Sequence, residues 1–82
     1  MDAIRSLIAK TMEEIAKEFG SDLNELRDDT VLLSSGLSSL GFAVLVVRLE
    51  EKLGYDPFLL DSEAIYPNTF IELVEYYQKW KP

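Results

Sequence analysis

The groups in this sequence that could do chemistry are the serine hydroxyls of residues 32–40, which read LLSSGLSSL. This run contains a flexible glycine, Gly36, and ends with Ser38 and Ser39 at the start of an apolar, helix-forming segment. A serine in this place is a favoured N-cap, because its side-chain oxygen accepts a hydrogen bond from a free backbone N–H group. The residues alone leave two interpretations open, a helix cap and a hydroxyl that another molecule modifies.

Two absences limit the chemistry that the side chains themselves can do. The 82 residues include no cysteine and no histidine. There is consequently no thiol nucleophile, disulfide or thiolate metal site, and the usual general base near neutral pH is missing. Carboxylates are plentiful, yet no nucleophile–base pair or metal-ligand spacing accompanies them. We expect that the protein is not an enzyme and that any reactive atom comes from a group outside its own side chains.

The acidic residues between Ser21 and Ser38 resemble a calcium-binding loop in composition only. If that loop began at Asp22, Arg27 would stand where calcium loops need a glycine, and Leu33 where they need a bidentate glutamate. A solvated acidic loop is the favoured interpretation, and no metal site is predicted.

The formal net charge of −7 excludes several kinds of partner. Nucleic-acid phosphates and anionic membrane surfaces repel an acidic protein, whereas basic patches on partner proteins attract it. The longest apolar stretch, residues 41–47, is far shorter than the ~20 residues of a membrane span, and the start of the chain lacks the pattern of a secretory signal. We expect a soluble, monomeric protein of the cytoplasm, with residues 1–82 in a single domain.

Apolar side chains recur at helical spacing in three segments of the chain. The first helix is predicted over Asp2–Phe19, with Gly20 as its left-handed cap. The second is predicted over Ser39–Leu53, and the last begins near Thr69, which forms a capping-box pattern with Glu72. The core stripe of the first helix comprises Ile4, Ile8, Met12, Ile15 and Phe19, and that of the last comprises Phe70, Leu73, Val74, Tyr77 and Trp80.

A long loop and a short element complete the predicted fold. The connection 21–38 contains the apolar triplet Val31–Leu33, which we expect to pin the loop against the helices. A short helical element is predicted over Leu59–Tyr66, between Pro57 and Pro67. The predicted fold class is all-α, a small four-helix bundle of three main helices and a short third helix, with a long loop between helices one and two.

The predicted second helix has two apolar faces. At ~100° per residue, a core stripe comprises Phe42, Leu45, Val46, Leu49 and Leu53. The opposite face comprises Leu40, Val44, Val47 and Glu51. Either the helix is covered on all sides or its outer face contacts another protein. We favour a recognition face, because the charged residues Glu51 and Arg48 lie at its edge and the other elements are too few to enclose it.

The five residues Gly36–Leu40 resemble the signature of the carrier-protein superfamily, which includes acyl carrier proteins and peptidyl carrier proteins. In that family a glycine, an aliphatic residue and usually an aspartate precede a serine and a leucine, at the start of a helix whose later part is rich in acids. Here the run is followed by the charged stretch 48–54, and residues 67–70 resemble the family's entry into its last helix. The resemblance covers roughly Asp29 to Tyr77, over half of the chain.

The resemblance implies that Ser39 carries 4′-phosphopantetheine, attached from coenzyme A by a phosphopantetheinyl transferase. The thiol of this arm would hold an acyl, aminoacyl or peptidyl group as a thioester, supplied by a loading ligase and passed to a downstream transferase or synthase. Such a carrier needs no reactive side chain of its own, since the cofactor brings the sulfur. One departure is Ser38, where the family usually has aspartate. Serine keeps the capping ability and loses a carboxylate that the transferase's metal-bearing site can use.

The outer face of the second helix is a second departure from the family. Housekeeping fatty-acid carriers are typically acidic there, whereas this chain has Gly41, Val44, Val47 and Arg48. When an apolar face docks on a partner, electrostatic attraction contributes less of the binding free energy. In this respect the chain looks more like the carriers of a specialised biosynthetic pathway. The predicted partner-binding residues are Leu40, Val44, Val47, Arg48, Glu51, Ile65 and Tyr66.

Two alternatives stay open at this point. The resemblance implies that the region of Ile65 and Tyr66 contacts partners and lines a space where a chain can tuck, but ordinary core packing is equally compatible with the sequence. Tyr55, Tyr76 and Trp80 are interpreted as packing residues. The alternative function is a protein–protein interaction module that keeps the carrier fold but is not phosphopantetheinylated.

Overall fold

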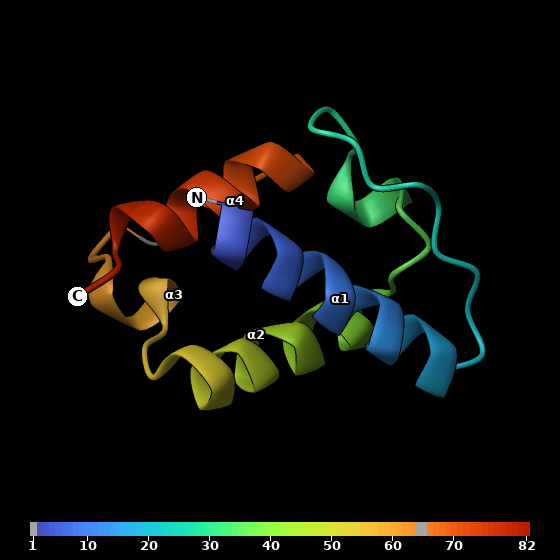
Figure 1. The fold of residues 1–82 in the computed structure, drawn as a ribbon, viewed down its shortest axis with the longest axis horizontal. Coiled ribbons are helices and arrows are strands. Elements are labelled where there is room, and N and C mark those ends of the chain that lie inside the picture. Colours follow the sequence, from blue (N-terminus) through green and yellow to red (C-terminus); the bar gives the residue numbers. More distant parts are fainter. Residues whose placement is uncertain (1, 64–65) are drawn as a thin grey trace.

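Three long helices and two short ones form the part of the chain that the computed structural model describes, residues 2–63 and 66–82. Helix α1 (Asp2–Glu18) contacts both α2 (Ser39–Leu53) and α4 (Phe70–Lys79), which lie on its two sides in Figure 1. The short α3 (Pro57–Leu60) and the 3-10 turn η1 (Leu32–Ser34) lie in the connections. With no β-strand among these residues, the predicted all-α bundle of three main helices and a short third helix is confirmed. None of these helices is long and apolar enough to cross a membrane.

Helix α1 forms because its apolar side chains repeat every three or four residues and face the other helices together. It ends in the predicted glycine cap: Gly20 has φ 69°, and the Ser21 N–H donates to the Ala16 carbonyl at 2.8 Å, as in a Schellman motif. Phe19 lies beyond the helix and is 42% exposed, so its predicted place in the buried stripe is wrong. The buried positions of the stripe are Ile4, Ile8, Met12 and Ile15.

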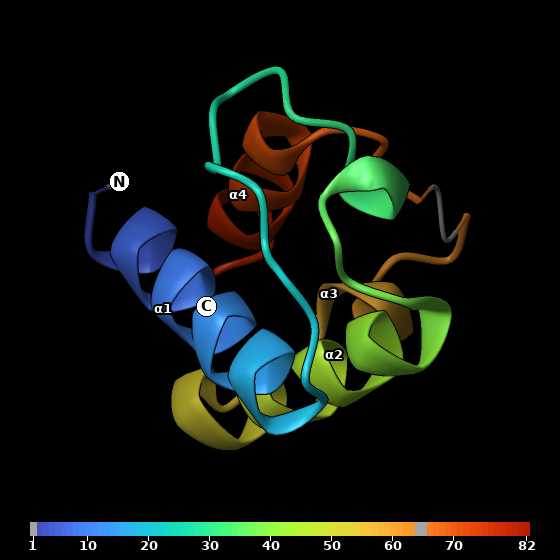
Figure 2. The same cartoon turned by 90° about the vertical axis from the view of Figure 1, so that its right-hand side faces the viewer.

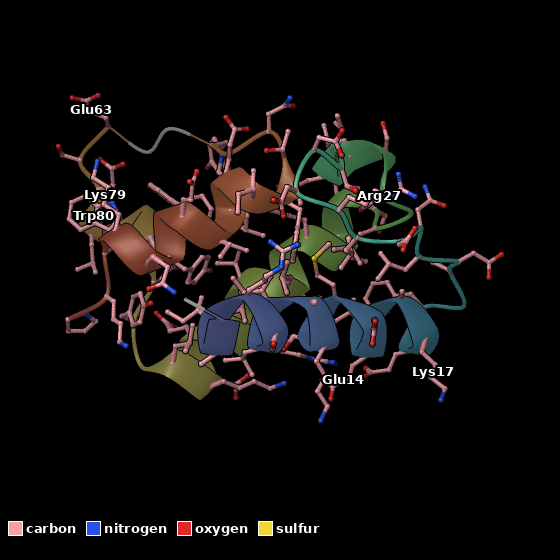
Figure 3. The ribbon with its side chains drawn as sticks, turned by 45° about the horizontal axis from the view of Figure 1, so that its top comes forward. Glu14, Lys17, Arg27, Glu63, Lys79 and Trp80 are labelled. Atoms are coloured by element: carbon pink, nitrogen blue, oxygen red, sulfur yellow. The ribbon has the colours of Figure 1, made fainter. Side chains whose placement is uncertain are left out.

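Helix α4 begins with the capping box predicted from the sequence. The Thr69 hydroxyl oxygen accepts a hydrogen bond from the Glu72 N–H at 3.3 Å, and the Glu72 carboxylate accepts one from the Thr69 N–H at 2.9 Å. Backbone hydrogen bonds from Thr69 and then Asn68 lower the pKa of Glu72. At the other end, the Lys79 ammonium lies 5.9 Å from the ring centroid of the half-buried Trp80 (Figure 3). The helix buries Phe70, Leu73, Val74 and Tyr77, as predicted.

The long connection between α1 and α2 runs past the start of α4 before it returns to α2 (Figure 2). It is held there by backbone bonds, since the Leu32 N–H donates to the Asn68 carbonyl at 2.9 Å and a single antiparallel β-bridge joins Val31 to Thr69. Of the predicted apolar triplet only Leu32 is buried, whereas Val31 and Leu33 are 37% and 77% exposed. Backbone hydrogen bonds and one leucine therefore pin the loop, and the prediction that three side chains do so is wrong.

Helix α3 differs from the predicted short element Leu59–Tyr66 at both ends, since it starts at Pro57 and finishes at Leu60. Asp56 is its N-cap, and the carboxylate accepts a hydrogen bond from the Phe58 N–H at 2.9 Å. Proline suits the first helical position because its φ is already helical and the N–H it lacks would have no partner there. The sequence pattern treated this proline as a boundary, which placed the element too late.

A tyrosine ties α3 to α4. The Tyr76 hydroxyl donates to the Asp61 carboxylate at 2.9 Å, and its ring centroid lies 5.0 Å from that of Phe58. Burial, followed by the hydrogen bond to Asp61, raises the pKa of Tyr76 to about 12. Tyr55 similarly donates to the Tyr77 carbonyl at 2.6 Å. Both tyrosines therefore make packing contacts of the kind expected from the sequence.

Removal of the Tyr76 hydroxyl should weaken the link between α3 and α4. At pH 7 we expect Tyr76→Phe to lower the free energy of unfolding by about 1 kcal/mol, the usual contribution of one hydrogen bond. The folded-state pKa of about 12 lies above the ordinary value of 10.0, so this contribution is complete below pH 10 and is lost as the pH rises to about 12. The free energies of unfolding of wild type and variant, measured by urea unfolding, should become more similar over this pH range. If their difference stays constant, the hydrogen bond assigned to Tyr76 and Asp61 is contradicted.

Candidate functional site

The two adjacent serines at the start of α2 have different positions. Ser38 is the N-cap, with extended backbone (φ −71°, ψ 171°), and its side-chain oxygen accepts a hydrogen bond from the Gly41 N–H at 3.1 Å. Its carbonyl accepts the first helical hydrogen bond, from the Phe42 N–H at 2.8 Å. Ser39 is the first residue inside the helix. The cap that the sequence assigned to one of the two serines is therefore Ser38.

Ser39 is exposed, and its hydroxyl has no hydrogen-bond partner among the residues that the structure describes. Within the same residues, its backbone N–H and that of Leu40 also take part in no hydrogen bond. Free N–H groups and the positive end of the helix dipole favour an anion at such a position. The structure therefore presents an accessible hydroxyl beside a small site that suits a negatively charged group.

Gly36 brings the loop before α2 against the segment after α1. Its φ is 100°, and a Cβ here would collide with the carbonyl oxygen of Asp22 and lie 3.0 Å from the carbonyl carbon of the same residue. Asn24 holds the two segments together: its backbone N–H donates to the Ser35 carbonyl at 2.8 Å and its side chain donates to the Ser34 carbonyl at 2.9 Å. These contacts fix the direction in which the chain enters α2.

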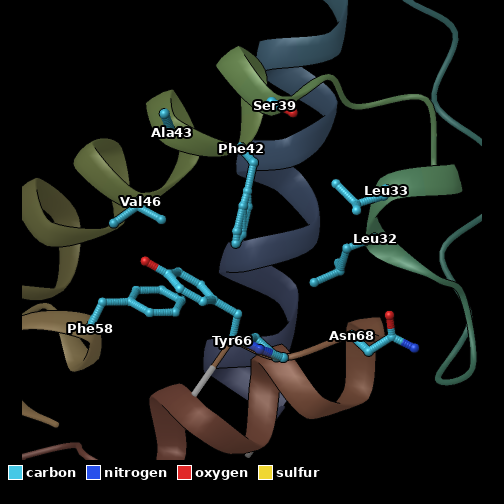
Figure 4. Close-up of a pocket in the computed structure, with 10 residues that line it drawn as sticks. Leu32, Leu33, Ser39, Phe42, Ala43, Val46, Phe58, Tyr66 and Asn68 are labelled. Atoms are coloured by element: carbon cyan, nitrogen blue, oxygen red, sulfur yellow. The ribbon is translucent and has the colours of Figure 1, made fainter. Parts of the chain in front are cut away.

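A cleft of about 540 Å³ opens beside Ser39 (Figure 4). Helices α2 and α3, the turn η1 and the connection from α3 to α4 supply its walls. The residue pattern did not predict this cleft, and the family resemblance implied only a space lined by the region of Ile65 and Tyr66. The aromatic residues Phe42, Phe58 and Tyr66 lie far apart in the sequence, so the pattern could not show that they would meet. Its apolar lining includes Leu32, Leu33, Phe42, Val46, Phe58 and Tyr66.

The inner side of α2 divides into a core face and a cleft face. Leu45 and Leu49 are fully buried, as the predicted core stripe requires. Phe42 and Val46, predicted in the same stripe, are half-buried and line the cleft. Leu53 is half-buried against the core at the far end of the helix. The predicted stripe is therefore correct in direction, but part of it faces a cleft rather than another helix.

The outer face of α2 is exposed at most of its predicted positions. Leu40 and Val47 are 66% and 58% exposed, and Glu51 is also exposed. Val44 is half-buried and packs partly against the core. The interpretation that this helix is covered all round is therefore wrong, and the exposed apolar surface is smaller than predicted.

Arg48 is paired with α1. Its guanidinium donates two hydrogen bonds to the Glu18 carboxylate, at 2.6 and 2.7 Å. This hydrogen bonding raises the pKa of Arg48 and lowers that of Glu18. One turn further along α2, the Lys52 ammonium lies 3.1 Å from the Glu14 carboxylate. The role of Arg48 in partner binding stays a prediction, for a side chain whose charge is already paired within the bundle.

The remaining candidates lie after α3. Ile65 is outside the described residues. Tyr66 is 73% exposed, and its ring stacks on that of Phe58 with centroids 5.3 Å apart and planes at 25°. Because so much of Tyr66 is exposed, it is not an ordinary core residue, and its other predicted role, partner contact, stays a prediction.

Comparison with known proteins agrees with this geometry. Residues 3–64 match the protein family described as "Phosphopantetheine attachment site". The non-reducing polyketide synthase CTB1 of Cercospora beticola is 33% identical to the chain over 54 residues. That alignment covers 66% of this chain and 2% of the relative, so the similarity concerns a small part of a much longer protein. No solved structure matches the chain.

The two serines should contribute differently to stability. We expect Ser38→Ala to lower the free energy of unfolding by about 1 kcal/mol, because the Gly41 N–H loses its capping acceptor. Ser39→Ala removes an exposed hydroxyl without a partner and should change stability by less than about 0.5 kcal/mol. Chemical unfolding of the unmodified proteins measures both values. Equal losses for the two variants would show that the cap is shared and would contradict the assignment.

Gly36 should tolerate no side chain. Gly20 is the matched control, because it also has positive φ (69°) but has no atom within 4 Å of the Cβ position. We expect Gly20→Ala to cost about 1 kcal/mol from backbone strain alone, and Gly36→Ala to cost about 2 kcal/mol more, because the methyl group meets the Asp22 backbone. Thermal and urea unfolding test this. Similar losses for both variants would mean that the close approach is absent in solution.

Proposed function

The chain belongs to the phosphopantetheine-attachment family, whose members bind 4′-phosphopantetheine covalently, and we propose that it is a carrier protein with the attachment point at Ser39 Oγ. The observation that carries this proposal is the accessible Ser39 hydroxyl, which the helix does not need as a cap because Ser38 fills that position.

The residues around Ser39 fit a phosphodiester. The hydroxyl is exposed, and the neighbouring backbone N–H groups of Ser39 and Leu40 have no partner among residues 2–63 and 66–82. These donors and the helix dipole favour the negative charge of a phosphate at this end of α2. When bound, the arm supplies a terminal thiol that holds an acyl, aminoacyl or peptidyl group as a thioester. The chain itself has no cysteine and needs none for this function.

The exposed apolar surface of α2 supports docking of partner enzymes. Leu40, beside the attachment point, and Val47, two turns further on, are largely exposed. In this proposal they contact a phosphopantetheinyl transferase, a loading ligase and a downstream transferase or synthase. Glu51 lies at the far end of the same face, and Tyr66 lies across the cleft.

The pathway proposed for this carrier is a specialised biosynthetic one in the cytoplasm. The outer face of α2 is apolar rather than acidic, and the relative from Cercospora beticola is by its name a polyketide synthase. Both observations support cargo of the polyketide type over that of a housekeeping fatty-acid carrier.

A second candidate function is a protein–protein interaction module that uses the same exposed face without an arm. The replacement of the family's usual aspartate by Ser38 favours it, because a carboxylate available to the transferase is missing. The two candidates differ in a covalent modification, which can be measured directly.

Intact-mass spectrometry tests the proposal. The purified chain is incubated with coenzyme A and a broad-specificity phosphopantetheinyl transferase, which forms the phosphodiester to the serine oxygen and releases adenosine 3′,5′-bisphosphate. We expect the mass to rise by one phosphopantetheinyl group in wild type and in Ser38→Ala, and to stay unchanged in Ser39→Ala.

Ser38→Asp restores the family's usual residue and keeps a capping side chain, so it separates a poor substrate from a non-substrate. Modification of wild type and of Ser38→Asp supports the carrier. If neither is modified while a control carrier is fully loaded in the same mixture, the carrier proposal fails and the interaction module is favoured.

A further inference from the structure

Gly41 lies in the first turn of α2 and is buried. Gly20, Gly36 and Gly54 have positive φ, whereas Gly41 does not, so any residue could adopt its backbone conformation. A glycine inside a helix destabilises the helix relative to alanine, because it loses more backbone freedom on folding. The reason for a glycine at this position therefore lies in its surroundings and not in its backbone.

The side chain of Leu37 occupies the space beside Gly41. A Cβ on residue 41 would lie 3.0 Å from Leu37 Cδ1, 3.1 Å from Leu37 Cγ and 3.4 Å from Ser38 Oγ. Leu37 is 5% exposed and belongs to the hydrophobic core. Because a packed core leaves few gaps, Leu37 has little room to withdraw. A methyl group on residue 41 would therefore displace Leu37 or the first turn of α2 by a few tenths of an ångström.

This contact lies directly before the candidate attachment point. Leu37 stands between Gly36, which is held against the segment after α1, and Ser38, which caps α2. The hydroxyl of Ser39 has no hydrogen-bond partner of its own in the described part of the chain. The direction in which this hydroxyl projects therefore depends on how the three preceding residues are held. The contact of Leu37 with Gly41 is the part of that support that reaches the core.

We propose that Gly41 is a positioning residue for the modification of Ser39. By leaving room for Leu37 against the first turn of α2, it fixes the direction of Ser39 Oγ during phosphopantetheinyl transfer. This inference rests on the proposed carrier function.

Phosphopantetheinyl transfer depends strongly on the position of the attacking oxygen. Ser39 Oγ forms a bond to a pyrophosphate phosphorus of coenzyme A, the bond from that phosphorus to adenosine 3′,5′-bisphosphate breaks, and the hydroxyl proton passes to a base of the transferase. The oxygen must approach in line, at about 3–3.5 Å, and a misplacement of about 1 Å can cost on the order of 100-fold in rate. A hydroxyl whose direction the fold already fixes needs no further ordering once the transferase has bound.

The kinetics of modification test the role of Gly41. Wild type and Gly41→Ala are modified by the same transferase at saturating coenzyme A, and the rate is followed by intact mass over a range of carrier concentrations. We expect kcat to fall about tenfold while the KM for the carrier stays within about twofold, because the docking surface is unchanged and the attacking oxygen is displaced. Circular dichroism verifies that the variant is folded. An unchanged kcat, or a raised KM with an unchanged kcat, overturns the inference.

A double-mutant cycle shows whether the methyl group acts through Leu37. Leu37→Ala removes both Leu37 atoms that the new Cβ would meet, so Gly41→Ala should lower kcat no further in that background. Leu37→Val removes Cδ1 alone and is used if Leu37→Ala does not fold at the assay temperature; the effect of Gly41→Ala should then be intermediate. If Gly41→Ala lowers kcat by the same factor in every background, the methyl group acts on the transferase directly and the inference is overturned.

The geometry and the carrier function can fail separately. In unmodified wild type we expect nuclear Overhauser contacts between the Leu37 methyl protons and the Gly41 Hα protons, and their absence overturns the inference whatever the kinetics. If wild type gains no mass while a control carrier is fully loaded, the carrier function fails and the inference fails with it. If wild type and Gly41→Ala are loaded at equal rates, the positioning role alone is overturned and the carrier function stands.

Discussion

The start of α2 depends on a hydrogen bond from the Gly41 N–H to the Ser38 side chain. A helix N-terminus has several N–H groups without an internal partner, and an N-cap side chain reaches back over the first turn only from the residue that precedes the helix. Because Ser38 holds that position, the next hydroxyl, on Ser39, projects from the first helical residue without a partner among residues 2–63 and 66–82. Of the two adjacent serines, Ser38 thus stabilises the helix, and Ser39 keeps an accessible hydroxyl.

The loop before α2 adds the second constraint. A long connection costs closure entropy, although the cost grows slowly with length. This one is tied at two points: Asn24 bonds to the residues just before Gly36, and Leu32 bonds to Asn68 at the start of α4. Apart from the bond donated by the Asn24 side chain, these ties join backbone groups, so the path of the loop depends on few of its exposed side chains. The same ties hold η1 in place as one wall of the cleft.

Features that a few neighbouring residues determine could be predicted from the sequence. The capping box of Thr69 and Glu72 and the glycine cap at Gly20 are local patterns, and both are present. The position of Phe42 could not be predicted in the same way. Periodicity gave the direction in which this side chain points, but whether a helix or a cleft faces it depends on where α3 and the following connection lie.

Side chains whose surroundings come from distant segments were the least predictable. The apolar side chain of Leu33 was predicted to pack against the helices. The backbone bonds on either side instead hold the turn so that this side chain lies at the open cleft, 77% exposed. Val44 was placed on the outer face and packs partly against the core. The partner contact predicted for Arg48 stays a prediction. The pairing of Arg48 with Glu18 could not be predicted, because the local sequence pattern did not position α1 beside α2.

That ion pair changes how the charge of the protein acts on its partners. Arg48 and Lys52 are both paired with carboxylates of α1, so the cations of α2 serve contacts between helices. The exposed apolar residues of α2 are Leu40, beside Ser39, and Val47, two turns further on. The net charge of −7 is distributed over the whole chain. Long-range attraction to a basic partner therefore comes from the overall charge and weakens with salt. In the proposed function, short-range complementarity at α2 comes from aliphatic contact, which salt does not screen. The proposal therefore implies a carrier that meets basic partners quickly but stays bound only to a partner that offers an apolar surface to α2.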